Sequence, residues 1–284
     1  ASILVGIIYS LSLNLPDNFI TKSAGSKLLQ IGIVILGLSI SLTKAFSVTD
    51  FYMPYISLLV IVTFFLGIYI GKLIGLDKKL TILIASGAAI CGGTAMVAIA
   101  PIIKAKPKDL LTAITIIFLL NAVAIIIFPI IGLYLGLSQD QFGAWAAMAI
   151  HDTSSVVGAA MIYGEEAVES AATLKLGRTL WLIPLILFLS YKHQATPSNK
   201  SKLPFFVMFF ILAIAIGSFI DLNNQTISFI KLISQCFLLL GLFCIGSQID
   251  KKALSNISIK PLQLALILWI IIIPSSYMLI QAAI

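Results

Sequence analysis

Long runs of apolar residues, separated by short polar turns, fill almost the whole chain. All but the first are close to the roughly 20 residues that a helix needs to cross a bilayer. The pattern predicts about ten membrane-spanning helices, near 1–13, 26–43, 51–71, 80–103, 110–136, 142–163, 170–191, 203–220, 226–249 and 261–283. We therefore expect an all-α polytopic membrane protein, with a single transmembrane domain over residues 1–284.

Composition and charge agree with this fold class. Of the 284 residues, 60% are hydrophobic and 10% charged, whereas soluble domains carry about a quarter charged residues. The net charge is +7, but the lysines stand at the ends of apolar runs, where the positive-inside rule places them, so nucleic acid is not an expected partner. The loops at 14–27, 72–79, 191–202 and 250–260 are predicted to be cytoplasmic. The lysines of 104–108 fall in a loop of opposite parity.

Two distant stretches resemble each other. LGLSISLTKAFS (36–47) matches IGSQIDKKALS (245–255) when one residue is skipped. About seven spans separate them, an odd number, so the copies would face opposite ways, as inverted repeats of secondary transporters do. The alternative is that glycine and lysine commonly end membrane helices. We expect a core bundle at 80–190 and scaffold-like repeat copies at 26–73 and 230–283.

The stretch 85–105, ASGAAICGGTAMVAIAPIIKA, has adjacent glycines near its middle. Gly92 and Gly93 lower helical propensity, and unwound backbone at membrane depth is tolerated only where it is buried or lines a cavity. A half-helix beginning near Thr94 would aim free N–H groups and its positive dipole end at the break. Residues Cys91 to Thr94 are therefore a candidate anion site, with tight packing through small residues as the alternative.

MAIHDTSSVVGAA (148–160) places five polar residues in an apolar run: His151, Asp152, Thr153, Ser154 and Ser155. Ionisable groups inside a span indicate function by default. His151 and Ser155 would share one helical face, and the hydroxyl run competes with regular helix, which favours a break. His151 and Asp152 are expected to couple transport to ions, because histidine titrates near neutral pH and a carboxylate stabilises its charged form. Alternatively, the pair caps a half-helix or bonds a neighbouring helix.

The stretch LKLGRTLWLIP (174–184) carries Lys175 and Arg178, three residues apart and so on one helical face. They either snorkel to the interface or supply positive charge to an anion site. Asn121 and Gln248 are weaker candidates, because a lone amide in a span usually joins helices. One acidic cluster is predicted to be solvated loop surface: Glu165, Glu166 and Glu169.

At these motifs the sequence resembles the YeiH-type sulfate exporter family of bacterial membrane proteins. Four stretches carry the match: SGAAICGGTAMVAIAPIIKAK, MAIHDTSSVVGAAMIYG, AATLKLGRTLWLIP and GSQIDKKAL…KPL. The chain departs from the family at Thr153, Ser154 and Ser155, where V-A-Q is frequent, so the substrate can differ. Family members also tend to have another hydrophobic segment before 1–13, so we expect that a segment precedes the abrupt start at Ala1.

The resemblance implies a fold related to the sodium/proton antiporter and bile-acid symporter group. Such folds have inverted repeats and two discontinuous helices that cross at the membrane midplane. Segments 85–97 and 148–159 would be the discontinuous elements. By span count they run in the same direction, whereas crossing partners related by inversion should be antiparallel, so either a span is miscounted or one segment is re-entrant.

The leading interpretation is a secondary active transporter of a small anion, acting as an exporter in the bacterial cytoplasmic (inner) membrane and coupled to protons by alternating access. The resemblance alone suggests a sulfur oxyanion or organosulfonate. The expected substrate-binding residues are Cys91, Gly92, Gly93, Thr94, Thr153, Ser154, Ser155, Lys175 and Arg178, and the ion-coupling residues are His151 and Asp152.

The alternative is a sodium/proton antiporter or a sodium-coupled organic-anion symporter, in which Asp152 and unwound carbonyls hold the cation. No nucleophile stands at a recognisable spacing, so we expect no enzyme, and no cofactor or metal is indicated. The expected partners are the lipid bilayer, a small inorganic or organic anion, and protons or sodium. A second copy of the chain, giving a homodimer, is left open.

Overall fold

The computed structural model describes residues 5–6, 8–9, 20–193, 205–220, 222–247 and 259–282. Every regular element that these residues form is a helix, as the apolar pattern predicts. The chain divides into two compact units, Ala1–Ser47 with Pro204–Asn256 and Val48–Leu203 with Ile257–Ile284. The predicted core bundle, 80–190, lies inside the second unit.

The first unit contains α2 (Ile20–Gly37), α11 (Phe205–Phe219) and α12 (Asn224–Gly246). Helix α2 packs along α12 and also contacts α11. A glycine permits the close approach, because a Cβ atom on Gly32 would lie 3.0 Å from the Leu238 side chain. The Ser234 hydroxyl donates to the Gly32 carbonyl at 2.8 Å, so the helices are joined by small residues and a hydroxyl, as is usual in membranes.

The predicted repeat copy 245–255 extends past the last described residue of the first unit, residue 247. Gln248 also lies outside the described residues. The match between 36–47 and 245–255 therefore stays a prediction.

Five helices among the described residues are long and apolar enough to cross a membrane: Leu42–Leu73, Pro107–Tyr134, Glu165–Lys192, Asn224–Cys244 and Ile259–Ala282. They correspond to α3 (Leu42–Leu73), α6 (Pro107–Tyr134), α9 (Glu165–Thr179) with α10 (Leu182–Lys192), α12, and α14 (Ile259–Ala282). The count of about ten spans is not confirmed. Two of the predicted spans, 80–103 and 142–163, are each divided into two short helices.

The first divided segment consists of α4 (Lys78–Ala89) and α5 (Gly93–Ile99). Asp77 begins α4, because its carboxylate accepts a hydrogen bond from the backbone N–H of Lys79 at 2.9 Å. Gly92, with φ 62°, reverses the chain, and α5 packs back against α4. The Lys79 Nζ atom donates to the Lys104 carbonyl at 2.7 Å, so the segment starts and ends at the same level. It is a re-entrant hairpin rather than a span.

The second divided segment consists of α7 (Gln139–Ala149) and α8 (Thr153–Tyr163). A capping box between Ser138 and Gln141 begins α7. The ring of Tyr163, the last residue of α8, stacks on Phe142 with centroids 3.9 Å apart, and its hydroxyl donates to the Leu137 carbonyl. The end of α8 therefore lies beside the start of α7, and this segment is also a re-entrant hairpin.

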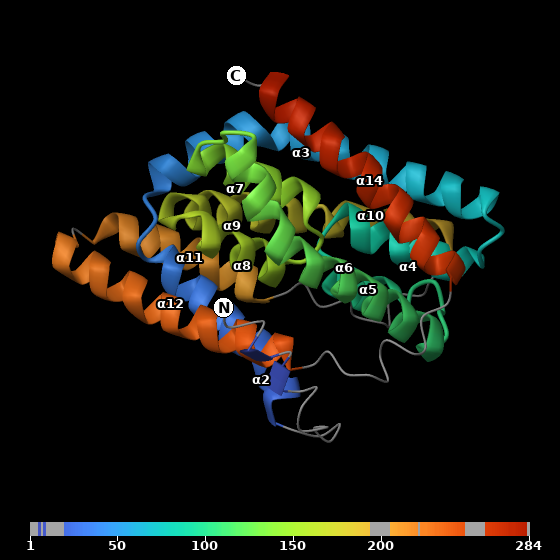
Figure 1. The fold of residues 1–284 in the computed structure, drawn as a ribbon, viewed down its shortest axis with the longest axis horizontal. Helices are drawn as coiled ribbons and strands as arrows, with labels where there is room; N and C mark the ends of the chain where they lie inside the picture. The colour runs from blue at the N-terminus through green and yellow to red at the C-terminus, as the bar shows by residue number, and fades with distance from the viewer. Residues whose placement is uncertain are drawn as a thin grey trace. The chain divides into compact units, whose positions relative to one another are not determined.

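Helix α6 connects the two hairpins and sets their directions (Figure 1). It starts next to the base of the first hairpin and ends next to the base of the second, so the hairpins enter from its opposite ends. Helices α4 and α7, of 12 and 11 residues, are each about 17 Å long, roughly half of a 30 Å hydrocarbon core. The tips meet, because a Cβ atom on Gly92 would lie 3.1 Å from the Cβ of Asp152.

This arrangement also sorts the charges of the second unit. Lysines gather at one end of α6, which we call the lysine-rich end. They lie at or near the start of α4, α6 and α14 and the end of α3, α5 and α10. These lysines are Lys72, Lys78, Lys79, Lys104, Lys106, Lys108, Lys192 and Lys260. The start of α14 belongs there because Lys260 Nζ would be 3.9 Å from a Cβ on Gly75, in the turn after α3. The other end, the acidic end, carries Asp140, Glu165 and Glu166 and no lysine among the described residues of this unit.

The end of α10 also lies at the lysine-rich end. Burial, followed by the charges of Lys78, Lys192 and Lys79, lowers the pKa of His193. The hydrogen bond from Lys79 to the Lys104 carbonyl places the lysines of 104–108 at the same end as those of 72–79, so the opposite parity assigned to them was wrong. It followed from counting 80–103 as a full crossing, whereas a re-entrant hairpin returns the chain to the end at which it entered.

Candidate functional site

The carbonyl groups at the tips of both hairpins converge on one guanidinium. Arg178, on α9, donates through Nη2 and Nε to the carbonyls of Ala88 and Ala89, at 2.7 and 2.8 Å. Its Nη1 donates to those of Ala147 and Met148, at 2.8 and 2.6 Å. These carbonyls belong to the last turns of α4 and α7, which lack partners within their helices. Arg178 therefore ties the ends of the two hairpins together.

Lys175 completes the same arrangement one turn earlier on α9. Its Nζ donates to the Ile150 carbonyl at 2.6 Å and, more weakly, to that of Ala147 at 3.4 Å. A cation near the C-terminal end of a helix is favoured by the helix dipole. Both side chains are almost fully buried, Lys175 at 0% and Arg178 at 1% exposed. Neither therefore snorkels to an interface, and the hydrogen bonds of both go to backbone carbonyls.

Asp152 caps the returning helix of the second hairpin. Its Oδ1 accepts from the backbone N–H of Ser155 at 2.9 Å, and its Oδ2 accepts from the Ser155 hydroxyl at 2.7 Å. A negative charge at the N-terminus of a helix is favoured by the helix dipole. The side-chain amide of Asn121, in the middle of α6, also donates to Oδ2.

His151 lies in the break itself, not on the helix of Ser155, so the predicted shared helical face was wrong. The backbone N–H of His151 donates to Asn121 Oδ1 at 3.3 Å, and His151 Nδ1 lies 3.3 Å from the same oxygen. We expected the Asp152 carboxylate to stabilise the charged form of His151 directly. Instead, the Asn121 side chain lies between them and contacts both. The weaker candidate Asn121 thus joins both ion-coupling candidates.

The remaining predicted site residues lie at or beside the tips. Both breaks are present, at 90–92 and 150–152, and the half-helix expected near Thr94 begins at Gly93. Cys91 is buried, within electrostatic reach of Lys175 and Arg178. Thr94 is exposed, whereas Gly93, Thr153 and Ser154 are half-buried. The three hydroxyl residues 153–155 form the first turn of α8 rather than the break.

One acidic residue was misplaced by the sequence pattern. Glu165 and Glu166 are exposed, as predicted, but Glu169 is buried within α9, not in a loop. Helix α9 begins at Glu165, so Glu169 lies one turn inside it.

Trp269 was not singled out by its sequence, because it lies within a continuous apolar run. Its ring, on α14, lies 6.3 Å from that of His151, centroid to centroid. Trp269 also stacks on Phe128 of α6 at 6.1 Å. Helix α14 packs on α4, α6 and α7, so it contributes this residue to the region of the tips.

Comparison with known proteins identifies related chains. The family model described as "Conserved hypothetical protein 698" matches residues 1–265. A UPF0324 membrane protein of Porphyromonas gingivalis is 38% identical over 95% of this chain and 83% of its own length. Similar proteins of the same name are 41% identical in Photobacterium profundum, over 90% of this chain and 78% of that protein, and 34% identical in Bdellovibrio bacteriovorus, over 96% and 85%. No solved structure matches this chain.

Proposed function

We propose that this chain, which belongs to the Conserved hypothetical protein 698 family of UPF0324 membrane proteins, is a secondary transporter that moves a small anion together with protons. Irregular backbone at membrane depth occurs where it is enclosed by protein or lines an aqueous path. Two re-entrant hairpins that enter from opposite ends and meet tip to tip are such a structure, and secondary transporters place their sites at broken helices near the midplane.

The observation that carries the anion assignment is the charge at the junction of the tips. Lys175 and Arg178 are both buried there, and Asp152 is the carboxylate that the described residues bring to the same place. Buried charge at membrane depth is costly and needs compensation. An anion at the tips supplies the missing negative charge.

The same contacts argue against the sodium-coupled alternative. That alternative needs carbonyl oxygens freed by the helix breaks and a carboxylate with an available oxygen. The carbonyls at the ends of α4 and α7 already accept from Arg178 and Lys175. Both oxygens of Asp152 accept from Ser155 or Asn121. The chain's own cations therefore bind the helix-end carbonyls that such a sodium site would use.

Charge distribution supports an orientation for the transporter. Short loops rich in lysine are retained on the cytoplasmic side of the membrane. We place the lysine-rich end in the cytoplasm and the acidic end outside, in the cytoplasmic (inner) membrane of a bacterium. The first hairpin then enters from the cytoplasm and the second from the opposite side, and export is the direction in keeping with the family resemblance.

Ion replacement in proteoliposomes tests this function. The purified protein is reconstituted into vesicles loaded with labelled sulfate or sulfite, and release is followed under an imposed pH gradient or an imposed sodium gradient. We expect release to follow the pH gradient and to be indifferent to sodium. Release that requires sodium would establish the symporter alternative. Sodium-proton exchange without anion movement would establish the antiporter and overturn the anion assignment.

A further inference from the structure

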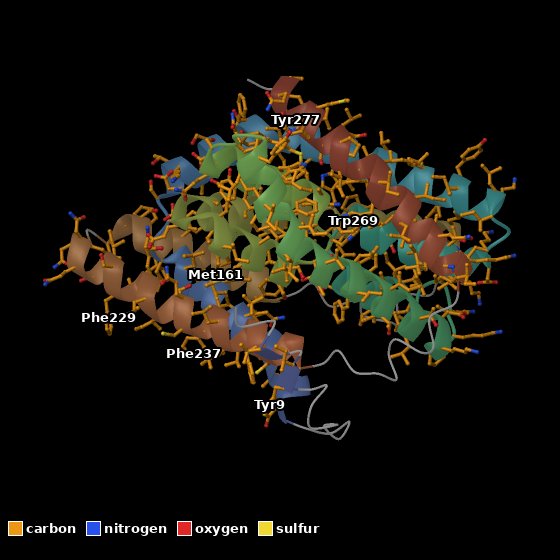
Figure 2. All side chains as sticks on the ribbon, viewed as in Figure 1. Tyr9, Met161, Phe229, Phe237, Trp269 and Tyr277 are labelled. Carbon is orange, nitrogen blue, oxygen red and sulfur yellow. The ribbon has the colours of Figure 1, made fainter. Side chains whose placement is uncertain are left out.

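Two buried ring nitrogens beside the junction of the tips have no hydrogen-bond partner among the described residues. They are His151 Nε2 and Trp269 Nε1. The His151 side chain is 1% exposed and that of Trp269 is 8% exposed. Folded proteins satisfy nearly all such buried polar atoms, so each one left unpaired calls for an explanation. Figure 2 labels Trp269 on α14, the helix that packs against α7.

The chain's other two tryptophans show that the unpaired indole is specific to this place. Trp145 Nε1 donates to the Ile273 carbonyl at 3.2 Å, and Trp181 Nε1 donates to the Ser57 hydroxyl at 3.0 Å. Both are in the same unit as Trp269. Partners for an indole N–H are therefore available within this bundle. Trp269 differs because its N–H has no such partner and its ring lies 6.3 Å from that of His151.

Asn121 determines which nitrogen of His151 carries the proton. The Asn121 amide nitrogen donates to Asp152, so Oδ1 is the atom that faces His151. An amide oxygen only accepts, so His151 Nδ1 must be the N–H donor. In the neutral ring Nε2 is then an acceptor, and in the charged ring it is a donor. The unpaired Nε2 is therefore the position at which a proton is gained or lost.

We propose that His151 Nε2 and Trp269 Nε1 form one subsite, which binds an oxygen-bearing anion together with one proton. The indole N–H only donates, so it requires an acceptor, which an oxygen of an oxyanion supplies. The neutral imidazole requires an O–H group, which a protonated oxyanion supplies, and the charged imidazole binds the unprotonated oxyanion. In both cases the complex holds a single proton between Nε2 and the anion. The subsite rests on the proposed function and adds to it a stoichiometry of one proton for each anion.

The surrounding charges link the two binding events. Lys175 and Arg178 of α9 lie within electrostatic reach of His151, and Asp152 is joined to it through Asn121. On the first hairpin, Cys91 faces the same two cations. An anion bound at the subsite places negative charge beside the imidazole and thereby favours its charged form. Binding of the anion and binding of the proton therefore assist each other, as coupling requires.

Calorimetry with inorganic sulfate tests the subsite, because sulfate carries no proton near neutral pH. The purified wild-type protein is titrated in buffers of different ionisation enthalpy at one alkaline pH, which gives the protons taken up per sulfate bound. We expect about one proton per anion, with linked binding as the reason. His151→Ala should abolish the uptake. Trp269→Phe should keep it but weaken sulfate binding about tenfold, the loss expected for a hydrogen bond to a charged group.

Trp181→Phe is the matched control, since it removes an indole N–H whose partner is a protein hydroxyl. It should bind sulfate as wild type does. A second measurement observes sulfate binding by nuclear magnetic resonance of the wild-type protein. With nitrogen-15 in the indole rings, the protein gives one signal for each of three tryptophans, assigned with Trp145→Phe and Trp181→Phe. Sulfate should shift the Trp269 signal and leave the other two in place.

A Trp269 signal that ignores sulfate, or a Trp269→Phe protein that binds like Trp181→Phe, would mean that water alone occupies these atoms and would overturn the subsite. If wild type both binds and transports the anion in that case, the proposed function stands without the subsite. If wild type neither binds nor transports an oxyanion, the proposed function itself fails.

Discussion

Gly92 at the tip of the first hairpin lies directly against Asp152 at the tip of the second. A Cβ atom on Gly92 would be 3.1 Å from the Cβ of Asp152, and the φ of Gly92 is 62°. Glycine is therefore required at this position for two separate reasons, the left-handed backbone and the contact between the hairpins. The two reasons can be separated by experiment, because the chain contains a glycine that has only the first.

Gly92→Ala is expected to lower the free energy of unfolding by more than Gly136→Ala does. Gly136 has φ 66° and nothing within 4 Å of a built Cβ, so its substitution reports the backbone cost alone, about 1–2 kcal/mol. Gly92→Ala adds the displacement of Asp152. Thermal unfolding of both variants in the same detergent measures the difference. Equal losses would contradict the contact between the tips.

Replacing Arg178 is expected to cost the most stability of any single substitution at the junction. Arg178→Met leaves four carbonyls without their donor, a loss of about 3–5 kcal/mol on the scale of a broken buried charge interaction. Arg178→Lys should recover little of it, because an ammonium cannot reproduce the planar fork. Lys175→Met removes fewer bonds and should cost less.

The exposed Lys106 provides the control for charge removal, and Lys106→Met should leave the free energy of unfolding unchanged. Chemical unfolding followed by tryptophan fluorescence compares the four variants. An Arg178→Met protein as stable as Lys106→Met would show that Arg178 does not hold the hairpins together.

Asp152→Asn is expected to preserve membrane insertion but to abolish proton-coupled anion transport. An amide oxygen can still accept from Ser155, so the cap of α8 survives. The new amide nitrogen, however, has no acceptor at Asn121 unless Asn121 turns over. That rotation removes the acceptor of His151 Nδ1 and releases the tautomer that exposes Nε2.

Asp140→Asn is the matched control for this substitution. The Asp140 carboxylate also accepts from a serine hydroxyl, that of Ser170, but at the acidic end instead of at the tips. Transport driven by a pH gradient in proteoliposomes should fall at least about a hundredfold in Asp152→Asn, the size of effect expected when a group that transfers protons is lost, and should be unaltered in Asp140→Asn. Full pH-driven transport by Asp152→Asn would exclude the residue from coupling.

Part of this architecture follows from local sequence. The adjacent glycines 92 and 93 and the polar run from His151 predict breaks in the two places where the helices stop. The re-entrant course of each segment does not follow, because hydropathy records the length of an apolar run and not its direction. Two short arms with a turn between them are as long and as apolar as one span.

The partners of the buried cations could not be predicted for a different reason. Arg178 binds the carbonyls of Ala89 and Ala88 on α4, which precede it in the chain by 89 and 90 residues. It also binds carbonyls on α7. Sequence spacing shows that Lys175 and Arg178 share a helical face. It does not show which carbonyls they bind, because every residue has the same backbone carbonyl. Trp269 gave no signal for a similar reason: an aromatic residue in an apolar run looks like packing until its N–H is seen to lack a partner.

The re-entrant course of the first hairpin makes a prediction that separates it cleanly from a full span. Single cysteines are introduced in a background in which Cys91, Cys236 and Cys244 are replaced by alanine. In that background, Lys78→Cys and Lys106→Cys should react with an impermeant thiol reagent from the same side of the membrane, because both positions are exposed at the lysine-rich end. Glu166→Cys, exposed at the acidic end, should react only from the other side.

The labelling is carried out on intact cells and on inverted membrane vesicles. The positive-inside rule predicts reaction of the two lysine positions in inverted vesicles and of the glutamate position in cells. If residues 80–103 cross the membrane once, Lys78→Cys and Lys106→Cys will react from opposite sides, and both the hairpin and the meeting of its tip with Asp152 will be wrong. If all three positions react in the opposite preparations, the hairpins stand and only the orientation is reversed.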